Sequence, residues 1–212
     1  MIGENRWAHE RVAGLGPRER RVHAAILRGF VVRPAAPREL AADERALASL
    51  VRRDLVQLGS DGGVAVAYPF SAGPTRQRVR VADGRGWWAM CAIDALAIPW
   101  LLWRPAEIHA NEPGSDRAVT VTLDPAAGTV SCRPAEAVVV AARAGGGCVA
   151  ACACPHINLF ASRAAADRYL ATPGLHGTTL TVGEAAAAAR RLFGGLAELV
   201  AGGGRREGPG VG

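Results

Sequence analysis

The chain has 212 residues, half of them hydrophobic, which is enough for one large domain or two small ones with a real core. Its net charge is +6, with much of the positive charge in the first 85 residues; this permits nucleic-acid contact, but a solvated Arg-rich surface is the simpler interpretation. The first 25 residues are charged and lack a continuous apolar segment, which favours a cytoplasmic protein. The five cysteines, an odd number, argue against a disulfide framework and leave thiols for metal binding or catalysis.

Residues 1–83 are predicted to form a helical N-terminal part with the order of elements of a winged helix. The expected elements are a helix from Pro17 to Leu27, an extended segment at 30–32, a short helix at 38–42, a helix at 43–58, and strands at 64–70 and 77–81 joined through Gly73 and Pro74. Asp43 caps the longer helix and Gly59 ends it. Winged helices bind DNA in many proteins, but no face of the 43–58 helix gathers arginines, so a packing role is favoured.

The longest apolar segment of the chain, residues 86–103, comes next. Its length is close to that of a membrane span, but Asp94 in its middle and Pro99 near its end argue against one. A buried helix from near Trp87 to Ile98 is expected instead. Cys91 and Asp94 are three residues apart and would share a face of it. Because burying an unpartnered carboxylate is costly, this pair indicates a functional site.

Residues 84–201 are predicted to form a second domain, followed by a flexible Gly-rich tail at 202–212. After the central helix we expect a loop at 104–114, strands at 118–123, 129–133 and 137–142 in one meander, a small-residue strand at 148–154 continuing through 155–160, a helix at 163–170 capped by Ser162, a loop and short strand at 174–182, and an Ala-rich helix at 184–199. The fold class is therefore α+β: a helical, winged-helix-like N-terminal part packed on a domain of antiparallel strands and helices.

Cysteines mark the later part of this domain. Cys152 and Cys154 are two residues apart, so on a strand their side chains would point to the same face. Such a pair alone is a weak signal, because small buried cysteines are common. Together with the Cys91–Asp94 helix, however, two convergent thiolates and a carboxylate would suit a soft, thiophilic metal ion with a proton donor beside it. Cys132 and Cys148 are expected to be structural.

Three segments carry a family resemblance. Residues 88–96 with Pro99 are similar to a Trp-Cys-Ala-Leu-Asp-Thr-Leu…Pro segment, residues 154–162 to a Cys-Cys-His-Val-His-Phe-Phe-Ala-Ser segment, and residues 174–185 to a Gly-Leu-Glu-Gly…Val-His-Glu-Ala segment. All three segments are those of the organomercurial lyases, or alkylmercury lyases. The resemblance runs from about residue 78 to 195 and is specific, because Cys-x-x-Asp and Cys-x-His…Phe-Ala-Ser occur in the same order and at the same separation.

This resemblance implies a lyase that cleaves carbon–mercury bonds in mercury detoxification, with Cys91, Asp94 and Cys154 as the catalytic trio. The two thiolates would bind mercury, and Asp94 would take a thiol proton and deliver it to the departing carbon. The same three residues are the expected mercury ligands, with Cys152 as an additional candidate. No organic cofactor is expected. The implied partners are an organomercurial, low-molecular-weight thiols that release Hg(II), and a mercuric reductase, without nucleic acid or membrane.

The chain departs from the family pattern at three positions. Ala110 stands where a further structural Cys is usual, Pro155 where a second Cys is frequent, and Asn158 where His is common. His156 is expected to be a core or orienting residue rather than a ligand. Two other functions stay open: a thiol-based metal-binding or metal-sensing protein, with the winged helix on DNA and Cys152 and Cys154 on the ion, and a diverged biosynthetic relative.

Overall fold

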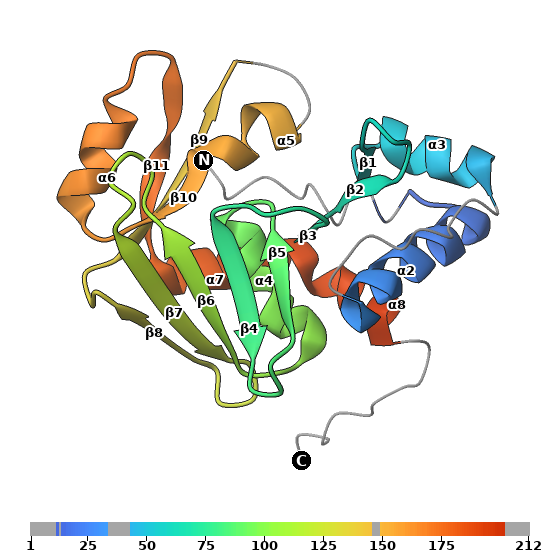
Figure 1. Ribbon diagram of the computed structural model, residues 1–212, viewed down its shortest axis with the longest axis horizontal. Helices are drawn as coiled ribbons and strands as arrows, with labels where there is room; N and C mark the ends of the chain where they lie inside the picture. Colours follow the sequence, from blue (N-terminus) through green and yellow to red (C-terminus); the bar gives the residue numbers. More distant parts are fainter. Residues whose placement is uncertain (1–11, 13, 34–42, 146–148, 202–212) are drawn as a thin grey trace.

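The protein has the predicted α+β fold, and its described residues form two antiparallel sheets and the helices around them (Figure 1). The computed structural model describes residue 12 and residues 14–33, 43–145 and 149–201. None of the helices in these ranges combines the length and the apolar character that crossing a membrane requires.

The described helices and strands follow one another along the chain in mixed order. The helical elements are α2 (Pro17–Val32), α3 (Glu44–Arg52), α4 (Ala92–Leu102), α5 (Val149–Cys152), η1 (Cys154–His156), α6 (Arg163–Leu170), α7 (Val182–Phe193), η2 (Gly194–Leu196) and α8 (Ala197–Ala201). The strands are β1 (Val56–Leu58), β2 (Val64–Ala67), β3 (Phe70–Ser71), β4 (Gln77–Val81), β5 (Gly86–Ala89), β6 (Ala106–Asn111), β7 (Ala118–Asp124), β8 (Thr129–Arg133), β9 (Val138–Ala144), β10 (Ile157–Phe160) and β11 (Leu175–Thr181).

The larger sheet has the strand order β1-β2-β3-β5-β4-β6-β7-β8. Strand β6 occupies a segment predicted to be a loop, and this prediction was wrong. Its buried positions are Ala106, Ile108 and Ala110, which alternate with exposed residues, the pattern of a strand with one face in the core. Two of the three are alanines, so the alternation is weak in the sequence.

The smaller sheet has the order β10-β9-β11. The predicted meander is therefore correct for β7 and β8, which pair with each other, but wrong for the third strand, because β9 leaves the larger sheet. Buried Glu112, just after β6, joins the sheets: its Oε2 accepts a hydrogen bond of 2.7 Å from the backbone N–H of Ala161, just after β10. This bond fixes the end of β10 against the larger sheet.

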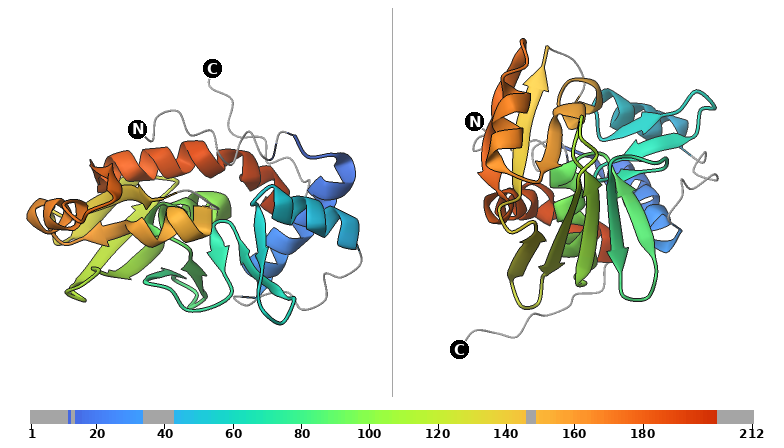
Figure 2. Two further views of the ribbon diagram at one scale, coloured as in Figure 1. Left: turned by 90° about the horizontal axis from the view of Figure 1, so that it is seen from above. Right: turned by 60° about the vertical axis from the view of Figure 1, so that its left-hand side comes forward.

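The central helix α4 lies between α7 and strands β4 to β7 of the larger sheet (Figure 2). The predicted helix from near Trp87 to Ile98 was wrong at both ends: Trp87 lies on β5, and the helix runs through Pro99 to Leu102. Aromatic residues favour strands, and a proline in the last turn leaves only one carbonyl, that of Ala95, without its helical partner. The residues of α4 are almost all apolar because the helix is buried on nearly every side.

Helix α2 is longer than predicted, because residues 30–32 continue the helix instead of forming an extended segment. The burial of Phe30 explains this: its ring stacks on Phe70 with ring centroids 5.6 Å apart, and its carbonyl accepts a 2.7 Å hydrogen bond from Trp87 Nε1. The helical part is thereby attached to the larger sheet. The predicted short helix at 38–42 lies outside the described residues.

The winged-helix order of elements is not confirmed. Helix α3 ends at Arg52, earlier than the predicted residue 58, because Asp54 takes a left-handed conformation at φ 54° and the chain turns into β1. The predicted ribbon of strands 64–70 and 77–81 does not form either. Strand β2 pairs with β1 and β3, whereas β4 pairs with β5 and β6. The larger sheet thus continues across the predicted domain boundary at residue 83, and the division itself stays a prediction.

The C-terminal elements were predicted in part. The strand expected at 148–154 is wrong, since α5 and η1 occupy its described portion; Cys148 lies outside the described residues. Helix α6 is confirmed, with Ser162 Oγ accepting from Ala165 N. The single helix expected at 184–199 is instead α7, η2 and α8, divided where Gly194 and Gly195 lower helix propensity. The tail at 202–212 also lies outside the described residues.

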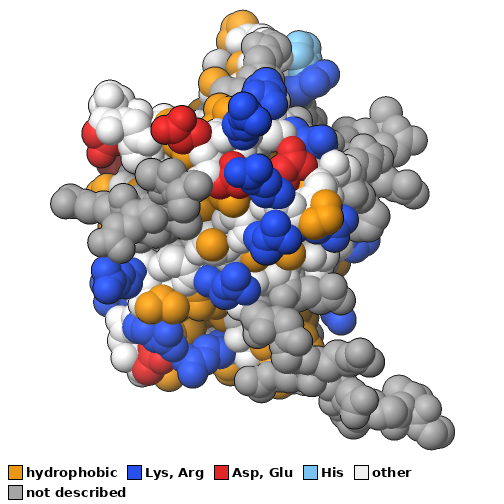
Figure 3. Space-filling model, turned by 90° about the vertical axis from the view of Figure 1, so that its right-hand side faces the viewer, with side chains coloured by type: hydrophobic (Ala, Val, Ile, Leu, Met, Phe, Trp, Pro, Cys, Tyr) orange, Lys and Arg blue, Asp and Glu red, His pale blue; other side chains and the backbone are white. Residues whose placement is uncertain are grey.

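Figure 3 shows the side of the molecule that carries α2 and α3. Basic side chains spread over it, and acidic and hydrophobic side chains lie among them. Exposed arginines of these two helices include Arg18, Arg21, Arg28, Arg45 and Arg52. The basic charge of the N-terminal part therefore lies on a mixed surface rather than on a uniformly positive one.

Candidate active site

Cys91, Asp94 and Cys154 lie together in the interior, although sixty residues separate the last two. One ligand atom from each lies within 4.8 Å of the others, and each side chain is 3% exposed. Among the described residues, these three side chains form the group of Asp, Glu, His and Cys residues that is spaced closely enough to hold a metal ion. The three predicted site residues are therefore brought together in space.

The N-terminus of α4 provides two of the three groups. Cys91 is the N-cap residue in an extended conformation, and its sulfur accepts a hydrogen bond of 3.5 Å from the backbone N–H of Asp94. Asp94 lies in the first turn of the helix, where a carboxylate benefits from the unpaired N–H groups and the helix dipole. The local sequence thus places a thiol and a carboxyl group side by side at a helix start.

Cys154 reaches the same place from a different part of the chain. It opens the three-residue turn η1, between α5 and β10, and its sulfur lies 3.9 Å from Asp94 Oδ2. Strand β10 is held by β9 and contacts α4, so the sheet carries the turn to the helix. Hydrogen bonds that involve sulfur are weak. This contact therefore shows that the Cys154 thiol and the Asp94 carboxyl group are close, and it contributes little stabilisation of its own.

Burial controls the protonation of the trio. It raises the pKa of the Asp94 carboxyl to about 7, because the hydrogen bonds from both cysteines offset the loss of hydration only in part. Burial, the contact with Cys154 and the Asp94 charge raise the pKa of the Cys91 thiol well above its usual value. The Cys91 contact lowers the pKa of Cys154, but burial and the Asp94 charge outweigh it, so that pKa is raised as well. Near neutral pH, Asp94 can therefore both accept and donate a proton.

The remaining candidates do not join the trio. Cys152, half-buried at the end of α5, is not part of the cluster, and the strand geometry that would have aligned it with Cys154 is absent. Cys132 lies on edge strand β8, where its sulfur faces the Ala135 carbonyl. His156 Nδ1 lies 2.9 Å from the Tyr169 hydroxyl. This contact fits the predicted orienting role of His156 rather than that of a ligand.

Two buried amides beside η1 were missed by the sequence analysis. Asn158 Nδ2 donates a 2.7 Å hydrogen bond to the Pro155 carbonyl, and Gln77 Nε2 on β4 donates to Asn158 Oδ1 at 3.4 Å. They connect the turn that carries Cys154 to the larger sheet. The sequence offered one signal for Gln77. It occupies the same buried face of an alternating strand as Val79 and Val81, where a polar side chain is unusual.

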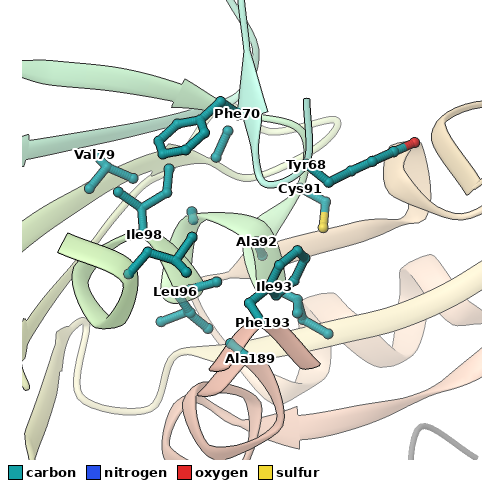
Figure 4. Packing of buried hydrophobic residues seen from close by; sticks show 14 of the residues in the cluster. Tyr68, Phe70, Val79, Cys91, Ala92, Ile93, Leu96, Ile98, Ala189 and Phe193 are labelled. Atoms are coloured by element: carbon teal, nitrogen blue, oxygen red, sulfur yellow. The ribbon is translucent and has the colours of Figure 1, made fainter. Parts of the chain in front are cut away.

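Tyr68, between β2 and β3, is a further neighbour that the sequence analysis did not identify. It is fully buried in the same hydrophobic cluster as Cys91 and Cys154. Figure 4 shows it beside Cys91, with its hydroxyl directed away from that residue. The Pro69 carbonyl accepts a 3.3 Å hydrogen bond from the backbone N–H of Met90, which keeps this turn against the start of α4.

Comparisons with known proteins identify a family for this chain. The family model described as alkylmercury lyase matches residues 70–194, more than half of the chain. A protein named alkylmercury lyase from Staphylococcus epidermidis is 33% identical over 116 residues, which are 54% of this chain and 52% of that protein. The chain thus aligns with about half the length of that relative.

A solved structure shares the fold. The mercury-bound form of MerB2 superposes with a TM-score of 0.70, covering 92% of this chain and 97% of that one, at 19% sequence identity. The similarity extends over both the helical N-terminal part and the two sheets. At this level of identity it establishes the fold and nothing finer.

Proposed function

This chain belongs to the alkylmercury lyase family, and we propose on that basis that it cleaves the carbon–mercury bond of organomercurials by protonolysis. The observation that carries the proposal is the buried meeting of two thiols and a carboxyl group, Cys91, Cys154 and Asp94, within 4.8 Å. The alkylmercury lyase relative supports the same activity.

The two thiols provide the mercury site. Thiolate sulfur is a soft ligand that suits a soft, thiophilic ion such as mercury. One cysteine displaces the ligand X of an R–Hg–X substrate, and its proton leaves with X as HX. The second cysteine then binds the same mercury atom. Both Hg–S bonds increase the electron density on mercury, which weakens its bond to carbon.

Asp94 moves the second proton. As a carboxylate it takes the proton of the second thiol, and as a carboxylic acid it delivers this proton to carbon. The electron pair of the C–Hg bond becomes the new C–H bond, so R–H leaves and Hg(II) stays on two sulfurs. A pKa of about 7 suits both halves of this task near neutral pH. Because the site is buried, water competes little for the proton.

The net reaction consumes R–Hg–X and two thiols and yields R–H, HX and the Hg(II) dithiolate. The chemistry requires no organic cofactor. External low-molecular-weight thiols are proposed to remove Hg(II) by ligand exchange, and a mercuric reductase is the class of enzyme that would consume it. The predicted cytoplasmic location belongs to the same proposal.

Product analysis tests this function. The protein, with phenylmercury and excess dithiol, is expected to release benzene, measured by gas chromatography, at a rate proportional to protein concentration. A Cys91→Ala variant and a Cys154→Ala variant should each abolish the release. Tight Hg(II) binding without any benzene from the unaltered protein would overturn the proposal and favour a metal-binding role.

A further inference from the structure

A cavity of about 670 Å³ lies where helix α7 meets the edge strand β8. Residues of α7, β8 and α4 line it, and none of them belongs to the catalytic trio. Trp100 of α4 lies nine residues after Cys91, so about 14 Å of helix separates this cavity from the start of α4. Its volume falls in the range of small-molecule sites, roughly 300–1,000 Å³.

Much of the cavity wall is apolar and is held by the core. Val130 on β8 and Ala186 on α7 contribute aliphatic surface, and the Trp100 ring contributes an aromatic one. The opposite face of α7, which includes Ala189 and Phe193, is buried beside α4 (Figure 4). The helix that provides most of the lining is therefore fixed in place.

Two arginines of α7 give the cavity a positive charge. The Arg190 guanidinium lies over the Trp100 ring, with its Cζ atom 4.8 Å from the ring centroid, and Arg191 lines the cavity beside it. Among the described residues, neither arginine forms an ion pair, and no acidic side chain lines the cavity. The last turn of a helix favours positive charge, but this does not account for an apolar cavity beside two unpaired arginines.

We propose that this cavity binds a small organic anion, a carboxylate attached to an apolar or aromatic body. Arg190 and Arg191 bind the carboxylate, whose two oxygens match the paired N–H groups of a guanidinium. The body of the ligand packs against Trp100 and the aliphatic wall. An inorganic anion would leave this wall unused, and a neutral apolar molecule would leave both charges without a partner.

The contact between Arg190 and Trp100 prepares the site for such a ligand. An arginine side chain loses rotamer freedom when it binds an anion, and this loss weakens binding. A cation over an aromatic face is already partly ordered, while the N–H groups at the edge of the guanidinium remain available as donors. Trp100 therefore contributes to affinity both through its own surface and through the orientation of Arg190.

Isothermal titration calorimetry on the whole protein, in a carboxylate-free buffer of low ionic strength, tests this proposal with 2-naphthoate as the probe. Saturable binding at one site is expected. The neutral analogue 2-naphthamide keeps the ring system but lacks the charge, so it should bind at least about tenfold more weakly. Acetate keeps the charge but lacks the apolar body, and a similar loss is expected.

Substitutions then locate the binding site. Arg190→Gln and Arg191→Gln each remove one exposed charge and should weaken 2-naphthoate binding about tenfold. Trp100→Phe should weaken it about threefold, because phenylalanine attracts a cation less strongly than tryptophan. Arg45→Gln, an exposed position on α3, changes the net charge equally and serves as the matched control. This control should bind 2-naphthoate like the parent.

Several results would overturn the proposal: no saturable binding of 2-naphthoate, equal affinity for 2-naphthoate and 2-naphthamide, or equal losses from Arg190→Gln and Arg45→Gln. Cys91→Ala, which removes a mercury ligand of the proposed lyase, should bind 2-naphthoate like the parent. A loss in that variant would place the probe in the trio site and contradict a separate cavity. Because the titration requires no C–Hg cleavage, its outcome is independent of the lyase assay.

Discussion

The two sides of the site are built in different ways. Cys91 and Asp94 come from one helix start, where the sulfur caps the helix and the carboxyl group lies in its first turn. Cys154 comes from the short turn η1, which is held by Asn158 of strand β10 and, through Asn158, by Gln77 of the distant strand β4. One side is a local structure that the four residues 91–94 define, and the other depends on the whole fold.

This difference explains how a buried acid can be placed next to two thiols. The helix start provides backbone N–H groups for Cys91 and a favourable field for Asp94, which lessens the cost of burying them. The η1 side provides no comparable backbone support, so hydrogen bonds from buried side chains fix it instead. Changes on the helix side should alter the chemistry, and changes on the turn side should alter the geometry.

The largest expected effect is on the helix side, from Asp94→Asn. The amide keeps the shape of the side chain but cannot deliver a proton, so benzene release should fall about 10³-fold, the usual range for a lost general acid. Hg(II) capture should persist, because both thiols remain. Release at the parental rate would show that the proton comes from elsewhere. Gas chromatography and mercury competition measure the two steps separately.

The same variant changes the pH dependence of stability. The folded pKa of Asp94, about 7, lies above its usual 3.8, so the folded state binds the proton more tightly and stability falls as pH rises between these values. Asp94→Asn removes this loss. Its advantage in thermal stability over the parent should therefore grow from pH 4 to pH 7, to roughly a few kcal/mol, and then level off. Melts at matched ionic strength measure it, and a constant difference across this range would contradict the prediction.

On the turn side, Asn158→Asp should have an intermediate effect. The substituted carboxylate cannot donate to the Pro155 carbonyl and is left buried beside it, which should cost about 1–3 kcal/mol of stability. Because η1 is loosened, kcat should fall by about tenfold. Denaturant melts and initial rates measure both, and normal kinetics in a destabilised variant would show that η1 needs no such tether.

A smaller effect, on folding stability, should distinguish the removal of Cys91 from the removal of Cys154. Cys91→Ala removes the helix cap along with the ligand and should cost about 1 kcal/mol. Cys154→Ala removes no cap, and Cys91→Ser restores an N-cap oxygen and should recover most of the loss. The three variants are compared by urea melts at one pH. If the two Ala variants were equally stable, the capping difference between the two sides would be insignificant.

The smallest effect is expected from Cys152→Ser. Its side chain lies outside the trio although it is only two residues from Cys154, so benzene release should stay within twofold of the parent. Steady-state rates in excess dithiol measure this. A large loss would mean that the turn side of the site extends to α5 and includes a third thiol.

The sequence by itself determined the local half of the site and much of the α+β composition. The Cys91–Asp94 spacing fixes those two groups beside one another, because helix geometry acts over three residues. Ser162 likewise predicts the start of α6 from the local sequence alone, because an N-cap acts within one helical turn. Motif similarity then pointed to Cys154, since no local spacing connects it with Cys91.

Only the tertiary structure decided the rest. Pro99 stayed within a helix because burial against neighbouring elements outweighs local propensity. β9 left the meander for the second sheet, because strand pairing joins segments at any separation along the chain. Contacts of this kind depend on which sheet a strand enters, and neither periodicity nor spacing encodes that choice.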